Sequence, residues 1–205
     1  MLASTILMNV VALLLAFQTL ASTLETSILG YDIVDTSWDL EVFPGQHMTP
    51  NGTIQEAVAQ ATHINPKFTT GNTTTTARDV STLKKRRYHD WSGRPKCKVP
   101  DFPNWGWANW EAIHLGAQYL DNINDGSKPG AGPGPGECGR VSCEWSSAIY
   151  WCNDKTVDRK LNSWSDIADG TVRLLEFCAG LQQDTVAGQQ FSNEDWNVIV
   201  HMDQC

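Results

Sequence analysis

All six cysteines of the 205-residue chain lie between residues 97 and 205: Cys97, Cys138, Cys143, Cys152, Cys178 and Cys205. An even set of cysteines in a short exported segment is typical of a disulfide framework. A structural zinc site is disfavoured, because no Cys-x-x-Cys pair occurs and the three histidines after residue 87, His89, His114 and His201, are scattered. The sequence therefore predicts three disulfides and no metal or other cofactor.

The N-terminus has the features of an export signal. An apolar run extends from Ile6 to Phe17 and is followed by small residues around Ala21. Such a run is too short for a bilayer span, which needs roughly 20 residues, but it matches the core of a secretory signal. We expect residues 1–21 to be a signal peptide and the protein to be secreted, extracellular and not inserted in a membrane. The alternative is a buried core helix.

The densest positive charge of this acidic chain lies in one block, Lys84, Lys85, Arg86 and Arg87, although the formal net charge is -8. The approach to the block, "FTTGNTTTTARDVSTL", is polar and lacks hydrophobic periodicity, which is typical of an exposed segment open to proteases. The alternatives are a solvated charge run and a patch for an anionic partner. The sequence favours cleavage by a kexin-type protease after Arg86 or Arg87.

This cut divides the exported chain into a propeptide, residues 22–87, and a mature domain, residues 88–205. Both N-glycosylation acceptors, Asn51 and Asn72, belong to the propeptide, which has no cysteine. "YDIVDTSWDLEVFPG" alternates like a strand, and "TIQEAVAQATHINP" has one apolar helical face. With few large apolar residues this segment is a poor candidate for folding alone, so we expect it to pack on the mature domain while the disulfides form.

The mature domain has 118 residues, enough for one domain. Its predicted elements, in order, are a strand at 96–99, a helix at 109–123, a hairpin at 138–152, a helix from Ser163 to Gly180 and a strand at 196–202. A hairpin centred on Trp145 places Cys138 opposite Cys152, so this pairing is one possibility. The glycine- and proline-rich stretch at 125–136 is expected to be an exposed loop. This order predicts an α+β two-layer sandwich with ferredoxin-like β-α-β-β-α-β topology.

The charge of the mature domain argues against two classes of partner. It has nine Lys and Arg against sixteen Asp and Glu, a net of -7. Such a surface repels phosphate backbones and anionic lipid heads, so we expect no nucleic-acid partner and no binding to bare membrane.

No catalytic residue is predicted. Gly134, Gly136 and Gly139 form a G-x-G-x-x-G pattern, but prolines remove backbone donors and a strand follows, so it is a chance match. Glu111 and His114 share a predicted helix face, as a ribonuclease-like acid–base pair would. We expect a protein that is not an enzyme, with a small hydrolase as the alternative.

Eight tryptophans lie in the mature domain, and four are expected in its core: Trp110, Trp151, Trp164 and Trp196. In "NWGWANW", Trp105, Trp107 and Trp110 cannot all point the same way on a helix, so Trp105 and Trp107 are the candidate binding residues. Exposed Trp suits protein hot spots and sugar faces. Cell-wall polysaccharide is therefore an alternative partner to a protein target.

The chain resembles a group of small secreted cysteine-rich fungal proteins. The residues that carry the resemblance are "GPGPGECGRVSCEWSSAIYWCND", "SDIADG", "QFSNEDWNVIVHMDQC" and the propeptide phrase "DLEVFPG…GTIQEAVAQATHINPKF". More loosely, its fold and cysteine framework are similar to those of fungal virus-encoded killer toxins and of effectors of plant pathogens. The resemblance implies an effector- or toxin-like protein that binds a target of a host or a competitor. Fold alone does not carry function.

Overall fold

The structure is a computed structural model and describes residues 28, 30–69, 90–98, 105–123, 127–180 and 184–205. The predicted signal peptide, the basic block at 84–87 and Asn72 lie outside these residues. No helix within the described ranges is long and apolar enough to cross a membrane.

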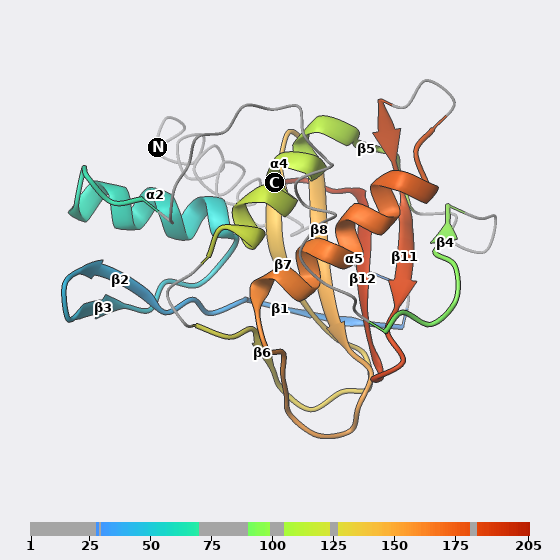
Figure 1. Cartoon of the computed structure of the whole chain (residues 1–205), viewed down its shortest axis with the longest axis horizontal. Coiled ribbons are helices and arrows are strands. Elements are labelled where there is room, and N and C mark those ends of the chain that lie inside the picture. Colours follow the sequence, from blue (N-terminus) through green and yellow to red (C-terminus); the bar gives the residue numbers. More distant parts are fainter. Residues whose placement is uncertain (1–27, 29, 70–89, 99–104, 124–126, 181–183) are drawn as a thin grey trace, which may run out of the picture.

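A six-stranded sheet forms the centre of the molecule (Figure 1). Its strands, in spatial order, are β1 (Asp32–Val34), β7 (Glu137–Glu144), β8 (Ser147–Asn153), β12 (Trp196–Met202), β11 (Gly188–Phe191) and β4 (Lys96–Cys97). The edge strand β1 runs parallel to β7, and the other neighbours are antiparallel. Three two-stranded pairs surround this sheet: β2 (Leu40–Phe43) with β3 (Gln46–Met48), β5 (Ala108–Asn109) with β10 (Thr185–Val186), and β6 (Gly130–Ala131) with β9 (Arg159–Lys160).

Helices α4 (Trp110–Asp121) and α5 (Trp164–Phe177) cover one face of the sheet (Figure 1). A capping box begins α5, because Ser163 and Asp166 bond each other's backbone N–H groups. Its apolar face, which includes Trp164, Ile167 and Leu175, is buried. The third helix, α2 (Ile54–Ile64), contacts α4 and β7, and it belongs to the predicted propeptide.

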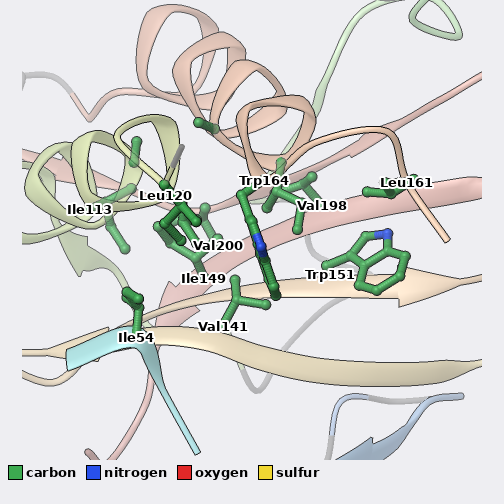
Figure 2. Close-up of a cluster of buried hydrophobic side chains, with 14 of the residues drawn as sticks. Ile54, Ile113, Leu120, Val141, Ile149, Trp151, Leu161, Trp164, Val198 and Val200 are labelled. Carbon is green, nitrogen blue, oxygen red and sulfur yellow. The ribbon is translucent and has the colours of Figure 1, made fainter. Parts of the chain in front are cut away.

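The larger core lies between the helices and the sheet, where Ile113, Trp151, Trp164 and Val198 are buried (Figure 2). A smaller core lies on the opposite face, because neighbouring residues of a strand point to opposite sides. It includes Tyr150, Ile199 and Trp105. Of the four tryptophans expected in the core, Trp151, Trp164 and Trp196 are buried and Trp110 is partly buried.

Three disulfides connect the six cysteines: Cys97–Cys178, Cys138–Cys152 and Cys143–Cys205. The hairpin prediction is confirmed, since β7 and β8 pair with Cys138 opposite Cys152. The first bridge joins edge strand β4 to the end of α5, and the third joins β7 to the C-terminal residue. The framework therefore holds both layers of the domain together.

The α+β class is confirmed, but the strand order differs from the ferredoxin-like order expected. That order would place the first mature strand, β4, between β8 and β12, whereas β8 and β12 pair directly along seven residues. Strand β4 has only two residues and pairs at the far edge with β11, a strand that the sequence analysis did not predict. The glycine- and proline-rich stretch at 125–136, which was expected to be a loop, also contains the short strand β6.

Candidate functional site

The two tryptophans predicted as binding residues lie in different environments. Trp105 is only 4% exposed and stacks on His201, with ring centroids 5.6 Å apart, so it belongs to the smaller core. Trp107 is 42% exposed, and the Lys98 ammonium lies 5.1 Å from its ring centroid. A binding role needs an exposed ring, so the structure does not support Trp105 as a binding residue, and of the two candidates Trp107 is the one available to a partner.

A third tryptophan, Trp145, lies at the turn between β7 and β8 and is 62% exposed. Its φ is 48°, and φ of the next residue, Ser146, is 53°. Two left-handed residues in a two-residue hairpin turn normally favour Asn-Gly, because the left-handed region is costly for a bulky L-residue. The chain places a large exposed aromatic ring where turn geometry favours a small residue.

Hydrogen bonds from Ser147 and Asp203, and a nearby disulfide, hold this turn. The Ser147 hydroxyl donates to the Trp145 carbonyl at 3.0 Å and accepts from the Asn109 backbone N–H at 2.8 Å. The Asp203 backbone N–H donates to the Ser146 carbonyl at 3.2 Å. The Cys143–Cys205 disulfide lies two residues before Trp145. Segments distant in sequence therefore fix the conformation of the turn.

Two more exposed apolar side chains are anchored at this end of the sheet. Met202 is about half exposed and lies opposite Ser147 in the β8–β12 register. Its backbone N–H donates to the Gly106 carbonyl at 3.0 Å, which brings the residue before Trp107 to the same strand end. We call Trp107, Trp145 and Met202 together the hairpin-tip surface.

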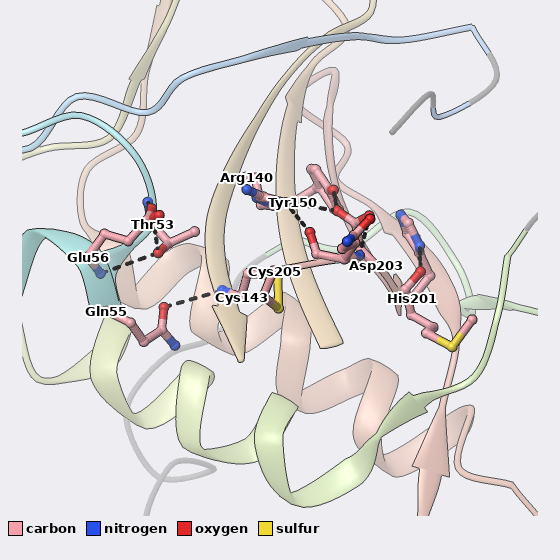
Figure 3. Close-up of polar contacts among 11 residues, drawn as sticks. Thr53, Gln55, Glu56, Arg140, Cys143, Tyr150, His201, Asp203 and Cys205 are labelled. Atoms are coloured by element: carbon pink, nitrogen blue, oxygen red, sulfur yellow. Dashed lines mark hydrogen bonds and ion pairs between the residues drawn. A yellow bond between two sulfur atoms is a disulfide. The ribbon is translucent and has the colours of Figure 1, made fainter. Parts of the chain in front are cut away.

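A buried acid, Asp203, anchors the C-terminal end of the chain (Figure 3). Asp203 accepts a short hydrogen bond from the Tyr150 hydroxyl and a second bond from Arg140 at 3.2 Å. Arg140 also donates to the Gln204 carbonyl at 2.9 Å. Burial, and then the bond to Asp203, raise the pKa of Tyr150, so its phenol stays protonated. This cluster rigidifies the chain end that carries Cys205 and is a structural anchor.

A polar cluster on the sheet receives a side chain from the predicted propeptide. The Tyr31 hydroxyl accepts from Gln189 at 3.0 Å and from Asn197 at 2.9 Å, and it donates to Asp154 at 3.3 Å. Burial, followed by the nearby Asp154, raises the pKa of Tyr31 to about 12. Burial also raises the pKa of Asp154. The hydroxyl of Tyr31 thus completes a set of hydrogen bonds in the mature domain.

The same segment lines a cavity of about 640 Å³ together with β7 and β8. Asp35 and Glu56 come from the propeptide side, and Arg140 and Tyr150 from the mature side. Asn51, the one predicted glycosylation site among the described residues, is exposed at this cavity. The cavity therefore marks part of the boundary between the two predicted parts of the chain.

The structure does not present Glu111 and His114 as an accessible acid–base pair. Glu111 is exposed, whereas His114 is buried, stacks on Trp110 and accepts from the Gln118 amide at 3.0 Å. Burial lowers the pKa of His114. Among the residues that the structure describes, no group of three His, Cys, Asp or Glu side chains is arranged to hold a metal ion.

The sequence predicted Trp145 at the centre of the hairpin, but Trp145 was not among the predicted binding residues. The available signal was its position, because a residue at a tight turn between two strands has no layer to cover it. Comparisons with protein-family models, with curated proteins and with solved structures find no match for this chain.

Proposed function

We propose that this is a secreted effector- or toxin-like protein, matured by kexin-type cleavage, that acts outside the producing cell by binding a protein of a host or a competitor. The observation that carries the proposal is Trp145, exposed and held in a left-handed conformation at the hairpin tip. Backbone strain of this kind is concentrated at functional sites, where surrounding contacts maintain it. The resemblance to small secreted fungal proteins supports the same class of function.

The chemistry of the hairpin-tip surface suits a protein partner. Tryptophan is the residue type most enriched in binding hot spots, and methionine adapts its shape to irregular apolar surfaces. The disulfide and hydrogen bonds behind the tip hold it in place before binding, which lowers the entropy cost of association. Trp107 contributes a second exposed ring, with the Lys98 ammonium beside it.

Cell-wall polysaccharide is the second candidate partner, and the exposure of Trp107 and Trp145 favours it. Sugars stack on exposed aromatic faces, and these two rings are anchored at the same end of the sheet. Co-sedimentation with chitin or β-glucan separates the two candidates. Retention that is lost in Trp107→Ala would favour the polysaccharide, whereas no retention by any polymer favours a protein target.

The direct test uses one folded preparation in two assays run in parallel. An effector should cause necrosis or suppress defence when it is infiltrated into leaves, and a toxin should inhibit the growth of other fungi or yeasts. Reduced and alkylated protein should be inactive in both assays. Inactivity of the native protein in both, or hydrolysis of RNA or glycan that Glu111→Gln or His114→Ala abolishes, would overturn the proposal.

A further inference from the structure

The segment N-terminal to the basic block is built into the fold of the mature domain. We call residues 28 and 30–69 the upstream segment, and residues 90–98, 105–123, 127–180 and 184–205 the downstream domain. Figure 1 shows the upstream segment in blue and cyan along one edge of the sheet and beside α4. Its contacts are of three kinds.

The first contact is strand pairing. Strand β1 pairs in parallel with β7, with Asp32 opposite Glu137 and Val34 opposite Gly139. A side chain at Gly139 would place its Cβ 2.5 Å from the Thr36 hydroxyl, and one at Gly136 would lie 2.7 Å from the Gly30 carbonyl. Glycines in the downstream domain therefore leave room for the upstream segment, for the Thr36 side chain at Gly139 and for the backbone at Gly136.

The second contact is the polar cluster around Tyr31. Without the Tyr31 hydroxyl, Gln189 and Asn197 would each lose a hydrogen-bond acceptor on the sheet. Each amide keeps one other acceptor, Asn197 for Gln189 and Asp154 for Asn197, but a buried N–H that loses its partner carries a desolvation cost. Gln55 adds a similar link at the other end of β7, since its amide bonds the Ser142 hydroxyl at 2.7 Å and the Cys143 N–H at 3.2 Å.

The third contact is apolar. Trp38 stacks on Trp164 of α5 with ring centroids 4.1 Å apart, and both rings are fully buried. Ile54, Ala57 and Ala61 direct the apolar face of α2 into the same core. The larger core thus contains side chains from both sides of the basic block.

No disulfide joins the two parts, because all six cysteines are paired within the downstream domain and residues 22–87 contain none. We propose that cleavage at the basic block does not release the upstream segment, and that the processed protein is a non-covalent complex of two chains. This inference rests on the cleavage proposed above, and its partner is a defined segment of the same precursor. Loss of that segment would uncover the β7 edge and the Trp164 ring, both of which favour aggregation when exposed.

The test begins with the secreted full-length chain cut by a kexin-type protease. Denaturing gels without reductant should show two bands, whereas native mass spectrometry and size-exclusion chromatography should show one species containing both chains. Elution of the downstream domain alone would overturn the inference. An uncut chain would contradict the predicted cleavage. A second version of the experiment, in which another protease makes the cut, would then test whether the two parts stay associated.

In that version, the four basic residues are replaced by the recognition sequence of a site-specific viral protease, so that the cut does not depend on natural processing. After cutting, Trp38→Ala should raise the concentration at which the complex dissociates by roughly a hundredfold or more. Phe43→Ala, which changes an exposed ring of the same segment, should change it by only a few fold. Dissociation of the cut wild-type protein at micromolar concentration, or equal effects of the two variants, would contradict the proposal.

Discussion

Trp38 and Trp164 stack face to face at 4.1 Å although 126 positions separate them in the sequence. The indole N–H of Trp38 donates to the Gly52 carbonyl at 2.8 Å, and that of Trp164 donates to the Ser127 hydroxyl at 2.9 Å. Both rings are therefore buried with their polar groups satisfied. The pair connects the segment before the basic block to the second helix of the domain after it.

Truncation of this stack should destabilise the uncut protein. Trp38→Ala removes a buried ring and leaves a cavity against Trp164, so we expect the free energy of unfolding to fall by about 3–5 kcal/mol. Urea unfolding of the uncut variant, in which a viral-protease sequence replaces the basic block, measures the change. Phe43→Ala is the matched control and should cost less than about 1 kcal/mol because Phe43 is exposed. Similar losses in the two variants would show that the stack adds nothing specific.

The N-terminal sequences of the secreted protein test the predicted cleavage. The basic block at 84–87 predicts that one sequence in the secreted protein begins at Arg87 or Tyr88. If the upstream segment is retained, a second sequence should begin near residue 22 in equal amount. N-terminal sequencing of the purified complex measures both. Intact chain continuing through Arg87 would contradict the cleavage.

The disulfides should all be formed in the secreted protein. Alkylation without reduction should add no mass, and peptide mapping should recover the pairs Cys97–Cys178, Cys138–Cys152 and Cys143–Cys205. Replacement of both Cys143 and Cys205 by Ser should lower the free energy of unfolding by about 2–5 kcal/mol. Two or more labelled thiols in unreduced protein would contradict the framework.

The stability should decrease as the pH falls below about 6.5, because two histidines are buried in neutral form. Burial lowers the pKa of His114 and of His201 from the usual 6.5. Between their folded pKa values and 6.5 the unfolded chain binds more protons than the folded one, so the stabilisation present above pH 6.5 is lost as the pH falls. Asp154 acts in the opposite direction, because burial raises its pKa above the usual 3.8. At pH values just above 3.8 the folded chain therefore binds more protons there than the unfolded chain, and this contribution to stability increases as the pH falls.

Urea midpoints at pH 7.5, 6.5 and 5.5 measure this effect. His201 donates from Nδ1 to the Met202 carbonyl at 2.7 Å and lies between the rings of Trp105 and Tyr150. A His201→Gln variant, which does not titrate, should show a smaller decrease between pH 7.5 and 5.5 than the wild type. An equal or larger decrease would show that His201 contributes nothing to the pH dependence.

The elements with local signals were predictable from the sequence. Helix α5 begins with a capping box at Ser163, and its apolar face repeats with helical period, so both its start and its buried side followed from the residues. The β7–β8 hairpin followed from two β-prone runs separated by "EWS". These features depend on neighbours within a few residues of one another.

The features that were missed depend on distant parts of the chain. Strand β4 contains two residues and pairs at an edge with β11, so nothing local distinguished its place in the sheet from a central one. Trp105 and Trp107 are two residues apart, and packing in the smaller core, including the stack on His201, buries Trp105 alone. The route of β1 into the sheet likewise depends on glycines more than a hundred residues downstream.

The most direct test of a binding role for the hairpin tip compares Trp145→Gly with Phe177→Ala, which removes a half-exposed ring at the end of α5. Glycine accepts the left-handed conformation at no steric cost, so Trp145→Gly should leave the free energy of unfolding unchanged or raise it by up to about 1 kcal/mol. We expect this stable variant to lose activity in whichever of the leaf or growth assays the native protein is active, while Phe177→Ala keeps it. Full activity of a folded Trp145→Gly protein would contradict a binding role for Trp145.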